Sequence, residues 1–278
     1  MKKFNLFSLA IAGTLALCVF GCQKKDAATT TGSNQNEISA TTKAQITALG
    51  FSTENARKVN GGYLVENDIL LSEANLTEKS SSPNLTIAST EQYRTTNVVK
   101  ALPRVITISV TNLPTVYSDA VNAMITRYNN LGLRFTFQRA AAGTTGQIDV
   151  VGFNEGPSGG YITLGSSGFP TSGGNPYNQI QMNTNPAAYG SNPNLGYLTS
   201  VLQHEVGHCI GFRHTDYKNR AYSCGGSASN EGTAGVGAVQ IPGTPSGPDA
   251  ASFMLACSIG SDRTFNANDV IALNYLYK

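Results

Sequence analysis

Three histidines in one short segment have the spacing of metal ligands. The segment HEVGHCIGFRH contains His204, His208 and His214, which are all three histidines of the chain. On a helix, side chains four residues apart lie on one face, so His204 and His208 can bind one ion together. Gly211 allows the helix to end in a left-handed turn, after which His214 can return as a third ligand. Three nitrogen ligands leave a tetrahedral zinc ion one open position, as in catalytic zinc sites.

Glu205 is the acid beside these ligands. It lies about 100° around the helix from His204, close to the ion without having to bind it. A carboxylate in this position can accept a proton from an activated water molecule, so we predict that Glu205 is the general base. The alternative is an amphipathic helix whose histidines bind nothing. The glycine and the third histidine stand at the spacing of the extended zinc motif, which favours a site for one catalytic Zn²⁺ ion.

The helix that carries the motif must face the ion on one side and a core on the other. An apolar stripe of Leu198, Leu202, Val206 and Cys209 predicts a buried helix from about Gly196 to Ile210. Other patterns predict strands in GGYLVENDILL, RVITISV, LRFTFQR and QIDVVGF, a pair of strands in GGYITLGSSG and NQIQMNT, a helix from Tyr117 to Tyr128, and a closing helix in NANDVIALNYLY capped by Asn266 or Asn268.

A family resemblance extends this interpretation. HEVGHCIGFRH followed by SFMLAC resembles the metzincin group of zinc metallopeptidases, and the run from QHEVGHCIGFRHTDY through IPGTP to NANDVIALNYLY is similar to the bacterial lipoproteins called dual-action HEIGH metallopeptidases. The resemblance covers residues 93–278. It implies an α+β, metzincin-like zincin fold, with a twisted mixed β-sheet, a zinc-binding helix and a small C-terminal subdomain that ends in a helix. It also implies that Met254 forms a Met-turn beneath the ion, and that an edge strand at Tyr161 to Ser166 pairs with an extended peptide.

Two positions depart from the metzincin pattern. Several families carry a tyrosine two residues after the turn methionine, whereas this chain has Ala256, which excludes a tyrosine ligand there. Tyr217 and Tyr222 are then the candidates for a hydroxyl group that assists the reaction. The acid after the third histidine is Asp216, which we interpret as a turn-forming or supporting residue without a catalytic role.

The N-terminus has the pattern of an export signal. Two lysines precede a mostly apolar core that ends in VFGC, so residues 1–21 are predicted to be a lipoprotein signal peptide with lipidation at Cys22. A plain secretory signal with an unmodified Cys22 is the alternative. Residues 22–45 are rich in Thr, Ser, Asn and Gln, and we expect a flexible tether to a membrane. The expected location is the cell envelope, at the outer membrane or cell surface, with release possible.

A segment before the peptidase domain resembles an inhibitory propeptide. VENDI, at residues 65–69, resembles the FxGD motif in the propeptide of astacin-type metzincins, which places Asp68 as an acid that binds the zinc ion and displaces water. The alternative is an ordinary turn acid before a strand. We therefore expect a propeptide at residues 46–92 and a metallopeptidase domain at residues 93–278.

Composition and cysteines narrow the class of protein. Charged residues make up 13% of the chain and the net charge is +2, so the sequence lacks the basic character of a nucleic-acid-binding protein. Beyond Cys22, three cysteines remain, and an odd number outside the cytoplasm indicates one disulfide and one free thiol. Cys209 belongs to the buried helix stripe, so Cys224 and Cys257 are the favoured pair. A thiol ligand to zinc is the alternative use.

These features predict a zinc endopeptidase that acts on extracellular or cell-surface proteins as a monomer. Its partners would be a protein or peptide substrate and a membrane, reached through the N-terminal lipid. Two other classes stay open: a surface-anchored zinc-binding protein without catalysis, and a zinc hydrolase of non-protein amides. Retention of Glu205 beside three histidines argues against the first, since metal binding alone needs no general base.

Overall fold

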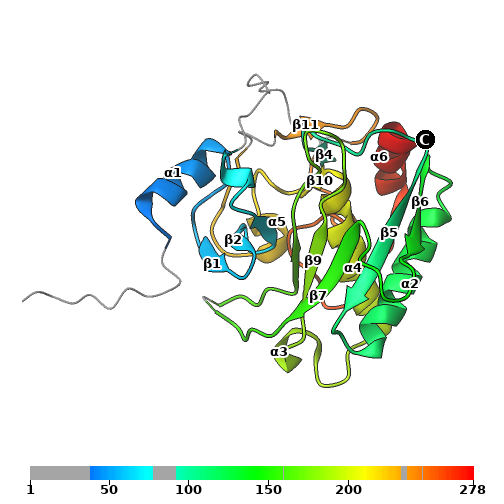
Figure 1. Cartoon of the computed structure of the whole chain (residues 1–278). Coiled ribbons are helices and arrows are strands. Elements are labelled where there is room, and N and C mark those ends of the chain that lie inside the picture. Colours follow the sequence, from blue (N-terminus) through cyan, green and yellow to red (C-terminus); the bar gives the residue numbers. More distant parts are fainter. Residues whose placement is uncertain (1–37, 78–91, 159, 233–236, 246) are drawn as a thin grey trace, which may run out of the picture. The chain divides into compact units, whose positions relative to one another are not determined.

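An eight-stranded mixed sheet forms the centre of the fold (Figure 1). The computed structural model describes residues 38–77, 92–158, 160–232, 237–245 and 247–278. The strand order is β1-β2-β3-β8-β9-β7-β5-β6, in which β9, β7, β5 and β6 are parallel and β8 is antiparallel to β9. The strands are β1 (Arg57–Val59), β2 (Gly62–Val65), β3 (Ile69–Leu71), β5 (Arg104–Thr111), β6 (Phe135–Arg139), β7 (Ile148–Phe153), β8 (Gly165–Ser167) and β9 (Gln179–Asn183).

Two long helices pack together on one face of this sheet (Figure 1). They are α2 (Thr115–Asn129) and α4 (Leu195–Ile210), and α4 also contacts β8 and β9. The predicted stripe of Leu198, Leu202, Val206 and Cys209 is fully buried, with 0% exposure. This burial fixes the rotation of α4, because its apolar side faces the sheet and α2 while its histidines face away.

The C-terminal part is small and rich in loops. It supplies β10 and β11 to a three-stranded sheet in the order β10-β4-β11, whose middle strand comes from residues 93–94, and it ends in the predicted helix α6, which begins with a capping box between Asn266 and Asp269. The predicted α+β fold with a mixed sheet and a C-terminal helix is therefore confirmed. The elements are β4 (Tyr93–Arg94), α3 (Pro186–Tyr189), β10 (Phe212–Arg213), α5 (Ala221–Cys224), β11 (Val239–Gln240) and α6 (Ala267–Tyr277).

The N-terminal segment is more structured than the sequence predicted. The prediction of a flexible tether over residues 22–45 is wrong for its last residues, because the helix α1 (Ala40–Ala48) begins at Ala40 with Ser39 as its N-cap. Its residue Ile46 packs into a second apolar cluster with Phe51, Val65 and Phe169. The single strand predicted in GGYLVENDILL is a hairpin of β2 and β3, followed by a short helix η1 (Asn75–Thr77). Tertiary burial of a few apolar side chains stabilises these short elements.

The edge strand predicted at Tyr161 to Ser166 also differs from the observed structure. Only Gly165–Ser167 of the cleft-lining segment forms a strand, β8, and it is not an edge in this structure. On one side β8 pairs with β9, and on the other it pairs in parallel with β3 through Ile69 and Ser167. The N-terminal segment therefore occupies the position at which an added peptide strand would pair with β8.

The predicted signal peptide and Cys22 lie outside the residues that the structure describes. Among the helices of the described ranges, none is both long and apolar enough to cross a membrane. Gln92, predicted to end the propeptide, is fully buried and donates hydrogen bonds to Ser252 Oγ (2.9 Å) and Asp269 Oδ1 (2.8 Å). By its contacts, Gln92 therefore belongs to the peptidase core.

Candidate metal centre

The structure brings the three predicted histidines to one point. His204 and His208 project from α4 one turn apart, and α4 ends at Gly211, whose φ of 113° is left-handed. The chain then turns through β10 and returns with His214. His208 Nε2 lies 3.1 Å from His204 Nε2 and 3.1 Å from His214 Nε2. Two nitrogens on a tetrahedral zinc ion with bonds of about 2.0 Å would be separated by about 3.3 Å, so the spacing fits zinc.

The other ring nitrogens show that the converging atoms are electron-pair donors. His204 Nδ1 lies 2.9 Å from the carbonyl oxygen of Phe253, and His208 Nδ1 lies 2.8 Å from that of Phe212. A carbonyl oxygen only accepts, so both Nδ1 atoms carry the proton and both Nε2 atoms of the neutral rings carry a lone pair. Lone pairs that face one another in a buried site repel unless a cation lies between them. These residues fit a metal ion.

The turn around Met254 supports the floor of the site. A Cβ on Gly207 of α4 would lie 2.5 Å from Met254 Sδ, so the buried methionine packs directly against the helix between the two ligand turns. Asp269 accepts a hydrogen bond from the backbone N–H of Phe253 (3.1 Å), whose carbonyl in turn orients His204. Met254 therefore packs against α4 at Gly207, between His204 and His208, and Asp269 holds the adjoining peptide in place.

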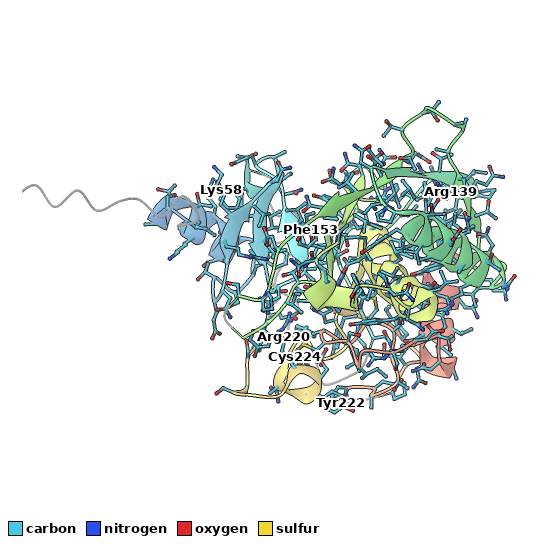
Figure 2. The ribbon with its side chains drawn as sticks, turned by 90° about the horizontal axis from the view of Figure 1, so that it is seen from below. Lys58, Arg139, Phe153, Arg220, Tyr222 and Cys224 are labelled. Atoms are coloured by element: carbon cyan, nitrogen blue, oxygen red, sulfur yellow. A yellow bond between two sulfur atoms is a disulfide. The ribbon has the colours of Figure 1, made fainter. Side chains whose placement is uncertain are left out.

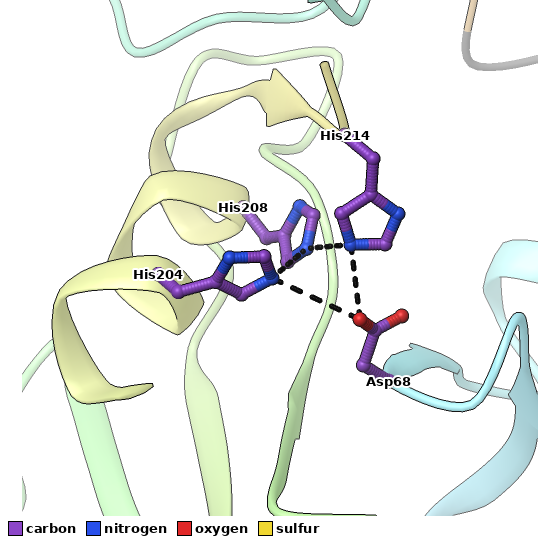
Figure 3. A group of neighbouring side chains, drawn as sticks. All are labelled: Asp68, His204, His208 and His214. Atoms are coloured by element: carbon purple, nitrogen blue, oxygen red, sulfur yellow. Dashed lines mark hydrogen bonds and ion pairs between the residues drawn. The ribbon is translucent and has the colours of Figure 1, made fainter. Parts of the chain in front are cut away.

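Asp68 also reaches the histidines. Its Oδ2 atom lies 2.9 Å from His214 Nε2 and 3.8 Å from His204 Nε2 (Figure 3). Burial alone would raise the pKa of Asp68, but the adjacent His214 and hydrogen bonds to both histidines hold it well below the usual value. In turn, although burial opposes its charged form, the Asp68 and Glu231 carboxylates raise the pKa of His214. The four side chains therefore favour a cation between them, whether a proton or a metal ion.

Glu205 lies in the cleft beside His204. The cleft is lined by Asp68, by residues of the segment 161–165 and by part of the Met254 turn. Glu205 is only 2% exposed, and its Oε2 atom accepts a hydrogen bond of 2.8 Å from Ser167 Oγ on β8. Burial raises the pKa of Glu205, and the Asp68 charge raises it further. Its position in the cleft, held by Ser167, is that of a carboxylate able to reach a water molecule beside His204.

Glu231 is a site residue that the sequence did not indicate. Its Oε1 atom accepts from His214 Nδ1 at 2.7 Å and from Arg220 at 2.7 Å, and its Oε2 atom lies 3.4 Å from Arg213. Although burial opposes ionisation, His214 and the two arginines hold the pKa of Glu231 well below its usual value. An ionised Glu231 keeps the proton of His214 on Nδ1 and leaves its Nε2 atom free for the ion.

Replacing Glu231 with glutamine should weaken zinc binding about 10- to 100-fold, the range for loss of a partner that orients a ligand. A glutamine side chain can still accept from His214 but carries no charge. The measurement is competition for zinc against a chelator of known affinity. Glu155→Gln, at an ion pair with Arg57 that is partly exposed, is the matched control. Equal zinc affinities of Glu231→Gln and the parent protein would contradict this role.

The remaining predicted residues take structural positions. Asp216 accepts from the backbone N–H of Ala256 (3.0 Å) and from Ser223 Oγ (2.6 Å), so it joins the loop after the third histidine to the Met254 turn. The ring of Tyr217 is buried 4.4 Å from that of Tyr93, whereas Tyr222 is 46% exposed. Neither tyrosine lines the cleft that contains Glu205. The structure contains a disulfide between Cys224 and Cys257, and Cys209 is a free, buried thiol.

Comparisons with known proteins place these residues in context. The sequence matches the family described as dual-action HEIGH metallopeptidases over residues 63–277, a range that contains both Asp68 and the histidine motif. No curated protein matches it significantly. Two solved structures of myroilysin share 14% sequence identity with this chain. The first match covers 65% of this chain and 82% of the myroilysin chain, with a TM-score of 0.41. The second covers 87% of this chain and 98% of the myroilysin chain, with a TM-score of 0.40. High choriolytic enzyme 1, a hatching enzyme zinc-protease from the medaka fish Oryzias latipes, shares 15% identity over 62% of this chain and 88% of its own, with a TM-score of 0.36.

Proposed function

The chain belongs to the dual-action HEIGH metallopeptidase family, and we propose that it is a metzincin-type zinc endopeptidase that cleaves extracellular or cell-surface proteins. The observation that carries the proposal is the convergence of His204, His208 and His214 beside Glu205 on the wall of one cleft. Three nitrogen donors and an unligated carboxylate are the composition of a site for metal-assisted hydrolysis. A site that only stores zinc would not require the carboxylate.

His204, His208 and His214 would hold the zinc ion, which when bound supplies Lewis-acid activation of water and of the scissile carbonyl. Glu205 accepts the proton that the attacking water loses and delivers it to the leaving amine. Ser167 holds the Glu205 carboxylate through its hydroxyl group, which fixes the direction from which the proton is taken.

The substrate would be an extended peptide along β8. In the present structure β3 fills this position, and Ser167 donates its backbone N–H to the Asp68 carbonyl at 3.0 Å. A substrate chain can use the same backbone groups once the N-terminal segment has left. Backbone pairing at this position favours proteins and peptides over non-protein amides as substrates.

The N-terminal segment would act as an inhibitory propeptide. Asp68 places a carboxylate oxygen against His214 Nε2 and blocks the open side of the histidine cluster (Figure 3). Pairing of β3 with β8 and an ion pair between Arg57 and Glu155 (2.9 Å) hold the segment in the cleft. Removal of this segment would then activate the enzyme. Export as a lipoprotein, with a signal peptide at residues 1–21 and lipid on Cys22, belongs to the same proposal and rests on the N-terminal sequence alone.

Chelation tests the proposed function. The protein should contain one zinc ion per chain, and after removal of the N-terminal segment its cleavage of casein should stop with 1,10-phenanthroline and return when zinc is added back. The physical reason is that the three histidines contribute binding but no Lewis acid of their own. Zinc at one ion per chain without cleavage of any protein, in preparations freed of residues 38–77, would indicate the non-catalytic alternative. Cleavage that is indifferent to the chelator would exclude a metallopeptidase mechanism.

A further inference from the structure

Two buried arginines next to the metal centre share two glutamates. Arg213 Nη2 lies 3.4 Å from Glu231 Oε2 and 3.5 Å from Glu66 Oε2. Arg220 Nη1 lies 2.7 Å from Glu231 Oε1, and it donates a hydrogen bond of 2.6 Å to the backbone carbonyl oxygen of Glu66. Two guanidinium groups and two carboxyl groups therefore meet in this cluster.

One of the two carboxyl groups comes from the N-terminal segment. Glu66 lies two residues before Asp68, on the turn between β2 and β3, whereas Glu231 lies 17 residues after the third histidine. Within the described ranges, Glu66 and Glu231 are the carboxylates paired with Arg213 and Arg220. If the segment leaves the cleft, two guanidinium groups stay behind with one carboxylate. A buried cation without a partner costs free energy, so this position would attract another anion.

Arg220 is well placed to bind that anion. It lines the cleft that also contains His204 and Glu205, and it lines the neighbouring hollow around Glu66 and Asn67. It immediately precedes α5, near Cys224 (Figure 2). The disulfide from Cys224 to Cys257 connects α5 to the chain that follows the Met254 turn, so Arg220 is attached to a rigid part of the wall. Glu231 holds the guanidinium group from behind.

Nearby carboxyl groups already stabilise the charged form of Arg220. Although burial opposes its charge, Glu231, Asp68 and Glu66 raise the pKa of Arg220, and two of these three acids belong to the N-terminal segment.

From this cluster we infer that the enzyme prefers peptide substrates with an aspartate or glutamate near the scissile bond, and that Arg220, supported by Arg213, binds that carboxylate. The inference rests on the proposed endopeptidase function. The guanidinium group of Arg220 can donate two parallel hydrogen bonds to one carboxylate, a geometry that the ammonium group of lysine cannot reproduce. The acidic side chain of the substrate would replace the charge that Glu66 contributes in the present structure.

The test compares peptides that differ only by glutamate or glutamine at each position around one cleaved bond. The full chain carries Asp68→Ala and Glu66→Gln, so that neither carboxyl group of the N-terminal segment competes with substrate. At one position, glutamate should raise kcat/KM about tenfold or more over glutamine, because a charge-assisted hydrogen bond is lost with the amide. Arg220→Gln should bring this ratio close to one, and Arg220→Lys should give an intermediate ratio. Arg139→Gln, which removes a positive charge that contacts Ser118 and Asn122 on α2, is the matched control and should keep the parental ratio.

The outcomes separate this inference from the proposed function. Cleavage of all peptides with no preference for glutamate at any position would overturn the role of Arg220 and leave the endopeptidase intact. A preference that persists unchanged in both Arg220 variants would overturn it as well. No cleavage of any peptide by zinc-loaded protein, also after the N-terminal segment has been removed, would instead contradict the endopeptidase function. Zinc content is measured for every variant, and Arg220→Lys decides the test if Arg220→Gln fails to bind zinc.

Discussion

Replacing Glu205 with alanine should remove nearly all peptide cleavage while zinc stays bound. The three histidine Nε2 atoms converge without help from Glu205, whose carboxylate contacts Ser167 on β8. The ligands should therefore keep their geometry in the variant. General base catalysis typically contributes about 10²- to 10⁴-fold to a rate, so kcat should fall by at least about a hundredfold. Single-turnover kinetics with a fluorogenic peptide, together with zinc analysis of the same sample, measures both effects.

Two variants make the Glu205 result specific. Glu205→Gln keeps the volume of the side chain and an oxygen that can accept from Ser167, but it cannot take up a proton, so it should be about as inactive as Glu205→Ala. Asp119→Ala removes an exposed carboxylate from α2 and should leave the rate unchanged. A Glu205→Gln protein that cleaves peptide at the parental rate, in a preparation free of other proteases, would show that another group is the base.

The local part of the site could be predicted because helix geometry determines it. A spacing of four residues puts His204 and His208 on one face, and only Gly211 at the end of α4 adopts the left-handed turn without strain, so the path to His214 follows from the sequence. The buried stripe on α4 was equally readable, since its period matches the helix. Each of these predictions depends on residues that are separated by at most a few helical turns.

The residues that orient the histidines and the Met254 turn could not be predicted, because only tertiary packing brings them together. Glu231 reaches His214 from a loop 17 residues later, and Gln92 reaches Asp269 across 177 residues. No periodicity links such positions, and each is a polar residue of a common type. The same reason explains the missed start of α1, whose residue Ile46 is buried by residues of the hairpin and by Phe169. The VENDI resemblance did indicate Asp68, but not that Glu66 next to it would reach Arg213.

Replacing Asp68 with alanine in the full-length chain should raise its peptidase activity about 10- to 100-fold. The expected size follows from losing a charge-assisted contact of about 1.5–3 kcal/mol, since each 1.36 kcal/mol is tenfold. Asp68 Oδ2 lies 2.9 Å from His214 Nε2, and the methyl group of alanine cannot reach or bind an ion there. A short fluorogenic peptide is the substrate, because the variant retains the rest of the segment in the cleft.

The increase should remain below the activity of protein freed of residues 38–77. In the Asp68→Ala variant β3 can still pair with β8, Arg57 can still pair with Glu155, and Glu66 can still contact Arg213, so the segment competes with substrate even without its carboxylate. Glu73→Ala removes an acid from the same segment that accepts a hydrogen bond from the Tyr63 hydroxyl group, and it should stay as inactive as the parent. If Asp68→Ala binds zinc, melts at the parental temperature and is no more active than the parent, Asp68 is not an inhibitory ligand. If the activity of Glu73→Ala rises by the same factor, a general loosening of the N-terminal segment explains the increase. Loss of the contact between Asp68 and the histidines is then not the cause.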